Sequence, residues 1–130
     1  MRLSYLPVQG SLMPVVDIAL WYRKRRLNTR ALVDSGAAVS VFDIEMAQHL
    51  GVRLNQAAGE TIEGIGGKAT AYPGNVSIEI GDQSFPLRVY FAAGVPINLL
   101  GRSDFFQHFL VLFDEPHHQL ELTPVPPAVS

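Results

Sequence analysis

The stretch Ala-Leu-Val-Asp-Ser-Gly-Ala at residues 31–37 decides how this sequence is interpreted. Its apolar first half is typical of a strand, and the strand delivers the carboxylate of Asp34 into a tight turn. Ser35, Gly36 and Ala37 form that turn, whose backbone N–H groups can hydrogen-bond the carboxylate and fix its direction. The same residues also fit an ordinary Asx-type turn that ends a strand, so the interpretation depends on other parts of the chain.

Two further segments contain glycine in informative places. Residues 62–67, Ile-Glu-Gly-Ile-Gly-Gly, lie between strand-like regions and predict a flexible hairpin whose backbone approaches a ligand closely. A phosphate-binding loop is the competing interpretation, but Ile62 stands where its first glycine belongs, and Ala69 follows the lysine where Ser or Thr is needed. Residues 97–102, Ile-Asn-Leu-Leu-Gly-Arg, predict an apolar strand that ends in glycine just before a helix.

In this order and spacing, the three segments resemble the retropepsins, which are the retroviral-type aspartic proteases and their cellular and bacterial relatives. The resemblance covers residues 14–123, nearly the whole chain. It implies an all-β, single-domain acid-protease fold, which is a closed β-barrel with a flap hairpin and one or two short helices. The protease domain is expected at residues 1–123, followed by a proline-rich tail at residues 124–130.

The resemblance also assigns roles to individual residues. Asp34 is implied to be catalytic, with Ser35 and Gly36 completing its turn. Residues 62–68 are implied to form the flap, and Leu-Leu-Gly at residues 99–101 to pack behind the active-site loop. The residues implied to bind substrate are Leu32, Ala37, Ala38, Ile62, Gly64, Ile65, Gly66, Ile97 and Leu99.

The chain contains Asp-Ser-Gly only once, so one copy supplies half of an aspartic protease site. The resemblance therefore implies a C₂ homodimer that cleaves a polypeptide between two Asp34 side chains, without a metal ion or cofactor. The alternative is a non-catalytic peptide-binding or dimerisation module of the same fold, which would grip an extended peptide by strand addition. The intact Asp34 and the glycine-rich flap argue against this alternative.

Two departures from the retroviral pattern affect these expectations. Ala38 stands where retroviral members carry a second Asp, which binds the substrate main chain and pairs with the following arginine. Arg102 therefore lacks that partner, and the loss of the acidic residue at Ala38 supports the binding-module alternative. The proline-rich tail cannot reproduce the interleaved terminal strands of retroviral dimers, because proline donates no ladder hydrogen bond. Residues 110–113, or the closing hairpin, are expected to provide the dimer surface instead.

Composition excludes several other classes of protein. The 130 residues carry a net charge of −2, which gives no electrostatic case for nucleic-acid binding, and include no cysteine for thiolate chemistry or disulfides. The longest apolar run, residues 89–95, is far shorter than the roughly 20 residues that span a bilayer, so no membrane segment and a cytoplasmic location are expected. His117 and His118 have no third ligand at a recognisable spacing, and no Gly-x-Ser-x-Gly sequence supports serine hydrolysis.

Local patterns predict short strands with few helices. The expected strands are residues 15–22 and 27–33 around the basic turn at 23–26, residues 75–80 and 85–91, and a closing hairpin of 110–113 with 120–122. A helix is expected from Asp43 to Leu50, capped by Asp43 and closed by Gly51. A second short helix, capped by Ser103 or Asp104, is expected to carry Phe105, Phe106 and Phe109.

Overall fold

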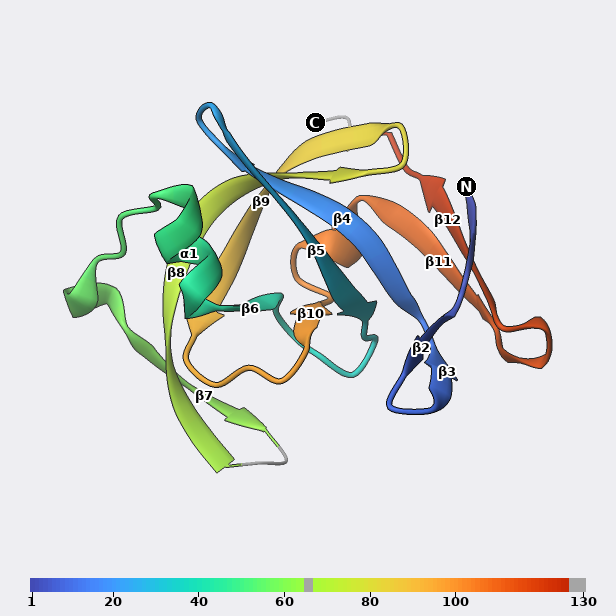
Figure 1. Ribbon diagram of the computed structural model, residues 1–130, viewed down its shortest axis with the longest axis horizontal. Helices are drawn as coiled ribbons and strands as arrows, with labels where there is room; N and C mark the ends of the chain where they lie inside the picture. Colours follow the sequence, from blue (N-terminus) through green and yellow to red (C-terminus); the bar gives the residue numbers. More distant parts are fainter. Residues whose placement is uncertain (65–66, 127–130) are drawn as a thin grey trace.

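The computed structural model describes residues 1–64 and 67–126, and most of them lie in strands (Figure 1). The larger sheet has seven strands in the order β4-β5-β10-β6-β9-β8-β7. Because β4 also pairs with β8, the strands from β4 to β8 form a closed circuit of pairings, and β7 extends it. The strands of this sheet are β4 (Val15–Tyr22), β5 (Arg25–Val33), β10 (Asn98–Leu100), β6 (Val41–Asp43), β9 (Gln83–Ala92), β8 (Gly67–Ile80) and β7 (Glu60–Gly64). The predicted all-β fold class is confirmed.

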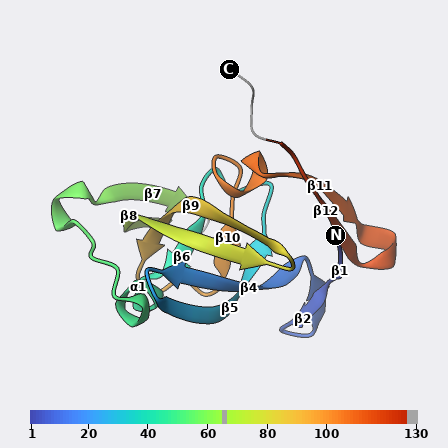
Figure 2. The same ribbon diagram turned by 90° about the horizontal axis from the view of Figure 1, so that it is seen from above.

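Two smaller sheets complete the chain. A terminal sheet has the order β1-β12-β11, and a separate hairpin pairs β2 with β3. Figure 2 shows the terminal sheet at one end of the molecule, beside the larger sheet. Their bounds are β1 (Arg2–Ser4), β12 (Gln119–Pro124), β11 (Phe109–Asp114), β2 (Leu6–Val8) and β3 (Ser11–Met13).

The first long hairpin has a shorter turn than the sequence suggested. β5 begins at Arg25 and not at residue 27, so the turn consists of Arg23 and Lys24, and Arg23 has a φ of 56°. Arg26 lies in the strand because it pairs with Trp21 and its guanidinium reaches the carboxylate of Glu79 at 3.5 Å. Both side chains of that ion pair remain more than a third exposed, so it contributes little to stability.

The predicted helix and core strands are present. α1 (Ile44–Leu50) is capped by Asp43, whose carboxylate accepts from the N–H of Glu45 at 2.9 Å. Gly51 ends the helix in a left-handed conformation, with φ 74°. In β8 the alternate side chains Val76, Ile78 and Ile80 are buried in the main core, as the period-two pattern predicted. Other large members of this core are Phe42, Phe91, Phe105, Leu20, Leu50, Leu100, Leu120 and Leu122.

The second predicted helix is wrong in extent. η2 (Phe105–Gln107) is a single 3₁₀ turn that begins after Asp104, and Phe109 already belongs to β11. Alternation explains the change, because Phe109, Val111 and Phe113 all pack against the main core from one face of the strand.

β12 extends to Pro124, so it includes the first residue of the expected tail. Val125 lies opposite His108 in the continued register of β11 and β12, and its N–H donates to the carbonyl of His108 at 3.0 Å. Val125 and His108 therefore form a hydrogen-bonded antiparallel pair. The next pair, Pro124 with Phe109, is therefore a non-bonded pair in which a missing N–H costs nothing. Proline is tolerated in this strand for that reason.

Tyr5 fixes the N-terminal segment to the end of the terminal sheet, a contact that no sequence pattern indicated. The Tyr5 N–H donates to the carbonyl of His118 at 2.8 Å, and its hydroxyl donates to Oε1 of Glu115 at 3.0 Å. The side chain is only 4% exposed. The β2–β3 hairpin follows, with Gln9 and Gly10 at positive φ in its turn.

The pH dependence of stability should reflect Tyr5. Burial and the neighbouring Glu115 raise the pKa of Tyr5 from 10.0 to about 12. The folded state therefore keeps a proton that the unfolded chain releases, so this stabilisation is complete below pH 10 and is lost as the pH rises toward 12. Urea unfolding at pH 8 and pH 11 should show a larger loss of stability for the wild type than for Tyr5→Phe. Equal losses would contradict the assignment.

Candidate active site

Asp34 follows β5 directly and lies half-buried in a turn that fixes both its backbone and its carboxylate. Its N–H donates to the carbonyl of Leu100 at 3.0 Å, and its own carbonyl accepts from the N–H of Ala37 at 3.2 Å. The N–H of Gly36 donates to Oδ1 of Asp34 at 2.8 Å. The carboxylate is therefore held in one direction, with its second oxygen left for other contacts.

The strand β10 forms the platform behind this turn. It runs parallel to β5, with Leu100 beside Val33 in the register. The chain after β10 then bonds to the active-site loop, because the N–H of Arg102 donates to the carbonyl of Ala37 at 2.9 Å. The N–H of Ser103 donates to the carbonyl of Ala38, also at 2.9 Å. Leu-Leu-Gly thus packs behind the loop in the way that the resemblance implied.

Sequence reasoning missed a buried polar connection between the loop and η2. Ser40 is fully buried, and its hydroxyl donates to the carboxylate of Asp104 while accepting from the N–H of Gly101 at 2.9 Å. The same carboxylate accepts from the N–H of Ser40 at 3.1 Å and from the N–H of Phe105 at 2.6 Å. The sequence showed Asp104 only as a helix cap, and nothing in the pattern indicated Ser40.

Ser40→Ala should destabilise the protein measurably. The substitution leaves the buried N–H of Gly101 without its partner and removes a donor from the half-buried carboxylate of Asp104. A loss of about 1–3 kcal/mol in the free energy of unfolding is expected. Ser103→Ala is the matched control, because Ser103 is exposed and should change stability by less than about 0.5 kcal/mol. Equal urea midpoints for the two variants would contradict this role of Ser40.

The flap prediction corresponds to the hairpin of β7 and β8, which projects from the body of the protein in Figure 1. Five register pairs run from Glu60 with Ala71 to Gly64 with Gly67. Ile62 is half-buried against a small cluster of Val41, Ala71 and Ala92. At the base of this hairpin, a hydrogen bond with Glu60 raises the pKa of Tyr90. The predicted site residues Ile65 and Gly66 lie outside the described residues.

The remaining predicted binding residues do not all lie together. Leu32 and Leu99 are partners in adjacent strands, so their half-buried side chains share one face next to the Asp34 turn. Ala37 and Ala38 belong to the loop itself. Ile97 instead lines a cavity of about 450 Å³ that also includes Met46 and Asn98 and does not reach Asp34.

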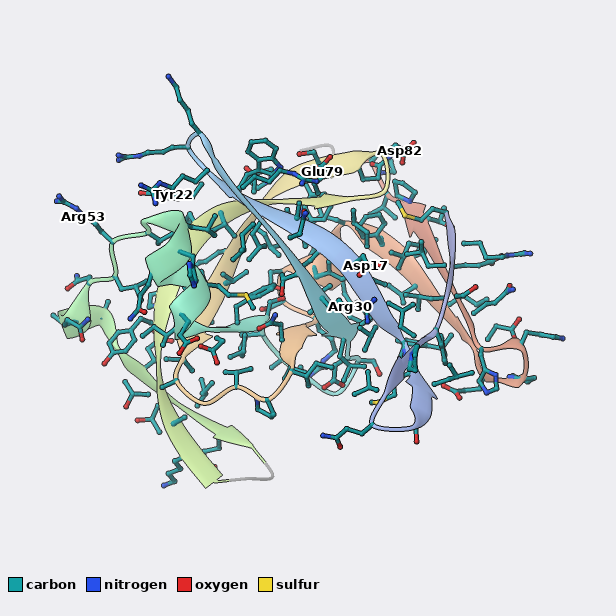
Figure 3. All side chains as sticks on the ribbon, viewed as in Figure 1. Asp17, Tyr22, Arg30, Arg53, Glu79 and Asp82 are labelled. Carbon is teal, nitrogen blue, oxygen red and sulfur yellow. The ribbon has the colours of Figure 1, made fainter. Side chains whose placement is uncertain are left out.

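A second cavity, of about 530 Å³, lies over β4 and β5 and also excludes Asp34. Its charged side chains pair with one another. Asp17 pairs with Arg30 at 2.9 Å (Figure 3), and Arg26 pairs with Glu79 at 3.5 Å. A hydrogen bond from the indole of Trp21 lowers the pKa of Glu79. All four charged side chains that line this cavity are therefore paired with one another. Asp34 remains the candidate catalytic residue.

Comparison with known proteins agrees with this geometry. The sequence profile described as aspartyl protease matches residues 24–103, more than half of the chain, and this range contains the Asp34 turn, the flap hairpin and β10. The chain belongs to the aspartyl protease family.

Solved structures place this aspartyl protease among the retropepsin-like folds. A retropepsin-like aspartic protease from Rickettsia conorii superposes with a TM-score of 0.63 at 21% identity, covering 92% of this chain and 97% of the other. EIAV protease in complex with the inhibitor HBY-793 gives a TM-score of 0.57 at 24% identity, covering 75% and 89%. No curated protein matches the sequence. The retropepsin-like fold expected from the three motifs is confirmed.

The structure describes the surroundings of the two departures from the retroviral pattern. Ala38 is exposed, and Arg102 takes part in no ion pair within the described residues. The carbonyl of Arg102 accepts from the side chain of Gln107 at 3.0 Å. Among residues 1–64 and 67–126, no three His, Cys, Asp or Glu side chains are grouped to hold a metal ion. No helix in these ranges is long and apolar enough to cross a membrane.

Proposed function

We propose that this aspartyl protease is an endopeptidase that acts as a C₂ homodimer with Asp34 of each subunit in a shared site. The supporting observation is the single Asp34 on a turn held by Gly36 and Leu100. Because Asp-Ser-Gly occurs once, a second carboxyl group at this site must come from a second copy of the chain.

The chemistry follows from placing the two carboxyl groups close together. Two negative charges a few ångströms apart are costly, so the pair holds one proton between them. The ionised Asp34 accepts a proton from a water molecule, and the oxygen of that water attacks the peptide carbonyl carbon. The protonated Asp34 of the partner subunit donates to the carbonyl oxygen. The tetrahedral intermediate then collapses, the C–N bond breaks, and the departing amine receives a proton.

Other residues are proposed to hold the substrate. Leu32 and Leu99 present apolar side chains beside the Asp34 turn, and Ile62 presents another at the base of the flap. Gly64, Ile65 and Gly66 are proposed to contribute flap contacts over the substrate, and Ala37 and Ala38 to contribute loop contacts. Cleavage of a peptide library should therefore show apolar preferences on both sides of the scissile bond.

The test is cleavage of casein and of a peptide library, with and without an inhibitor directed at aspartyl protease sites. Cleavage that the inhibitor blocks and a metal chelator leaves unchanged is expected. Saturable peptide binding without cleavage, at concentrations where the protein is dimeric, would favour the binding module that the exposed Ala38 allows. A library profile dominated by charged residues would contradict the assigned apolar contacts.

A further inference from the structure

Positive charge without an acidic partner gathers at one end of the molecule. The chain has 10 Lys and Arg residues, and four of them form ion pairs with carboxylates within the described residues. Four of the other six lie in two short segments, and all four are exposed. These residues, which we call the basic end, are Arg23, Lys24, Arg25 and Arg53.

The fold brings the basic end together from two elements. The turn between β4 and β5 lies beside α1 in both Figure 1 and Figure 2. Arg25 of this hairpin donates from Nη1 to the carbonyl of His49, in the last turn of α1, at 3.3 Å. Arg53 follows shortly after the end of that helix. The acidic residues Asp43 and Glu45 lie at the opposite end of α1, so they leave the charge of the basic end in place.

The turn itself has an unusual composition for a hairpin. Two-residue hairpin turns favour Gly, Asn or Asp, because they need a positive φ. Here Arg23 has φ 56°, and Lys24 follows it. The guanidinium of Arg23 lies over the ring of Tyr22, 5.3 Å from its centroid, and this contact restrains the side chain. Arg23 therefore loses less freedom when it binds an anion, and a binding role explains these two cations better than turn chemistry does.

The cavity of about 450 Å³ described above adjoins the basic end. His49 lines this cavity and also accepts from Arg25. Ile97 lines it as well and lies two residues before Leu99, which is next to the Asp34 turn. The cavity therefore lies between the basic end and the platform of the candidate active site. Its apolar lining residues are Leu27, Met46, Val95, Pro96 and Ile97.

The edge of β5 provides main-chain partners in this cavity. The N–H of Val33 donates to the carbonyl of Pro14, which fixes the hydrogen-bond alternation along β5. By this alternation the N–H and C=O of Asn28 point away from β4. β10 pairs only with residues 31–33, so Asn28 has no strand partner on that side within the described residues. Asn28 lines the cavity, where its backbone groups can bond to an extended polypeptide.

A polypeptide fits this surface better than a nucleic acid. The apolar lining offers no partner to phosphate groups, and Asp43 and Glu45, which also line the cavity, repel them. The ring of Tyr22 is already covered by Arg23, so it offers no platform for stacking a base. A polypeptide can place uncharged residues in the cavity and acidic residues at the basic end.

We propose that the basic end is an exosite, a binding site away from the cleaved bond, for an Asp- and Glu-rich segment of the polypeptide substrate. The substrate chain between that segment and the scissile bond lies along the cavity. The proposal rests on the proposed function, because the bound polypeptide is the substrate of that activity. Exposed charge pairs are individually weak, so the cations act together. Binding of the acidic segment raises the local concentration of the scissile bond and lowers KM, with little change in kcat.

Two matched peptides test the exosite. Both contain one cleavable sequence, a Gly-Ser linker and a tail, which consists of glutamates in one peptide and glutamines in the other. Among linkers of several lengths on either side of the cleavable sequence, the best should give the Glu-tailed peptide a KM at least ~5-fold lower at equal kcat. The difference should shrink as salt is added, because the contacts are exposed. Equal KM values at every linker length would overturn the proposal.

R23Q/K24Q tests whether the turn binds the tail. Both residues are exposed and glutamine keeps much of the side-chain length, so the variant should fold normally, which circular dichroism checks. The KM of the Glu-tailed peptide should rise at least ~3-fold, and that of the Gln-tailed peptide should stay unchanged. R2Q/R88Q is the matched control, because it removes the same charge from exposed positions outside the basic end. Equal effects of the two variants would mean that net charge attracts the tail, and the exosite would be wrong.

Direct binding separates the exosite from the proposed function. Fluorescence anisotropy measures binding of both labelled peptides to the Asp34→Asn protein, with and without R23Q/K24Q. If the Glu tail binds through the turn but the wild type cleaves neither peptide, the surface stands as a peptide-binding site and the endopeptidase assignment fails. If the wild type cleaves both peptides with equal KM, the exosite is wrong and the endopeptidase assignment stands. A single-stranded oligonucleotide that binds there more tightly than the Glu tail would overturn the choice of a polypeptide.

Discussion

Asp34→Asn should reduce kcat/KM for peptide cleavage by at least ~10⁴-fold while leaving the protein folded and dimeric. Proton transfer by a positioned side chain contributes typically ~10²–10⁴-fold, and this substitution removes both the base and the acid from the homodimer. An amide has nearly the shape of the acid, so the bonds from Gly36 and to Leu100 can be kept. The variant also relieves the repulsion between two close carboxyl groups.

Asp82→Asn is the matched control for this experiment, because Asp82 is an exposed turn residue far from the Asp34 loop in sequence (Figure 3). It should cleave peptides at the wild-type rate. The wild-type kcat/KM should follow a bell-shaped pH profile whose two limbs belong to the carboxyl pair as a unit. Undiminished cleavage by folded, dimeric Asp34→Asn protein would remove Asp34 from catalysis and with it the proposed mechanism.

Gly101→Ala should act by a different route, through a loss of stability of the native fold. A Cβ at position 101 would lie 2.4 Å from the carbonyl oxygen of Val39 and 2.9 Å from that of Ala37, and both are backbone atoms. Overpacking of a core typically costs about 1–3 kcal/mol, and a contact with rigid backbone belongs at the upper end or above it. A typical domain is stable by only about 5–15 kcal/mol. Thermal and urea unfolding should show a drop of about 3 kcal/mol or more.

Gly94→Ala separates this clash from a general effect of replacing glycine. Gly94 has φ 70° and open space around the position of a Cβ, so alanine there has only the conformational cost of about 1–2 kcal/mol. Gly101→Ala should therefore be clearly less stable than Gly94→Ala. If the two variants unfold at the same urea concentration, the close approach of Gly101 to the Asp34 loop is not needed for stability.

The sequence predicted the parts of the fold that depend on local patterns. Alternating apolar residues identified β8, and the cap at Asp43 with Gly51 identified α1, because each signal lies within a few neighbouring residues. The Asp34 turn and the strand β10 were each predicted from local patterns, but their packing against each other came from the family resemblance, since no local rule joins residues more than sixty positions apart. The resemblance could do so because the two segments occur in a fixed order.

Other features were beyond the sequence for identifiable reasons. Ser40 and Asp104 meet only after the chain has folded, and a buried serine has no pattern that distinguishes it from an exposed one. The helix expected through Phe109 failed because four phenylalanines within nine residues fit a helical face as well as a strand. Phe109 and Phe113 pack against the main core through contacts with residues distant in the sequence, and this packing favours the strand β11.

The position of β12 in the terminal sheet separates folding from assembly. β12 pairs with β1 and β11 of its own chain, so each subunit completes this sheet without borrowing a strand from another. In the proposed homodimer, a chain diluted below its dimerisation threshold would therefore keep this sheet and lack only the second carboxyl group. We therefore expect such a subunit to be folded but inactive, so that the concentration of the protein controls its own chemistry.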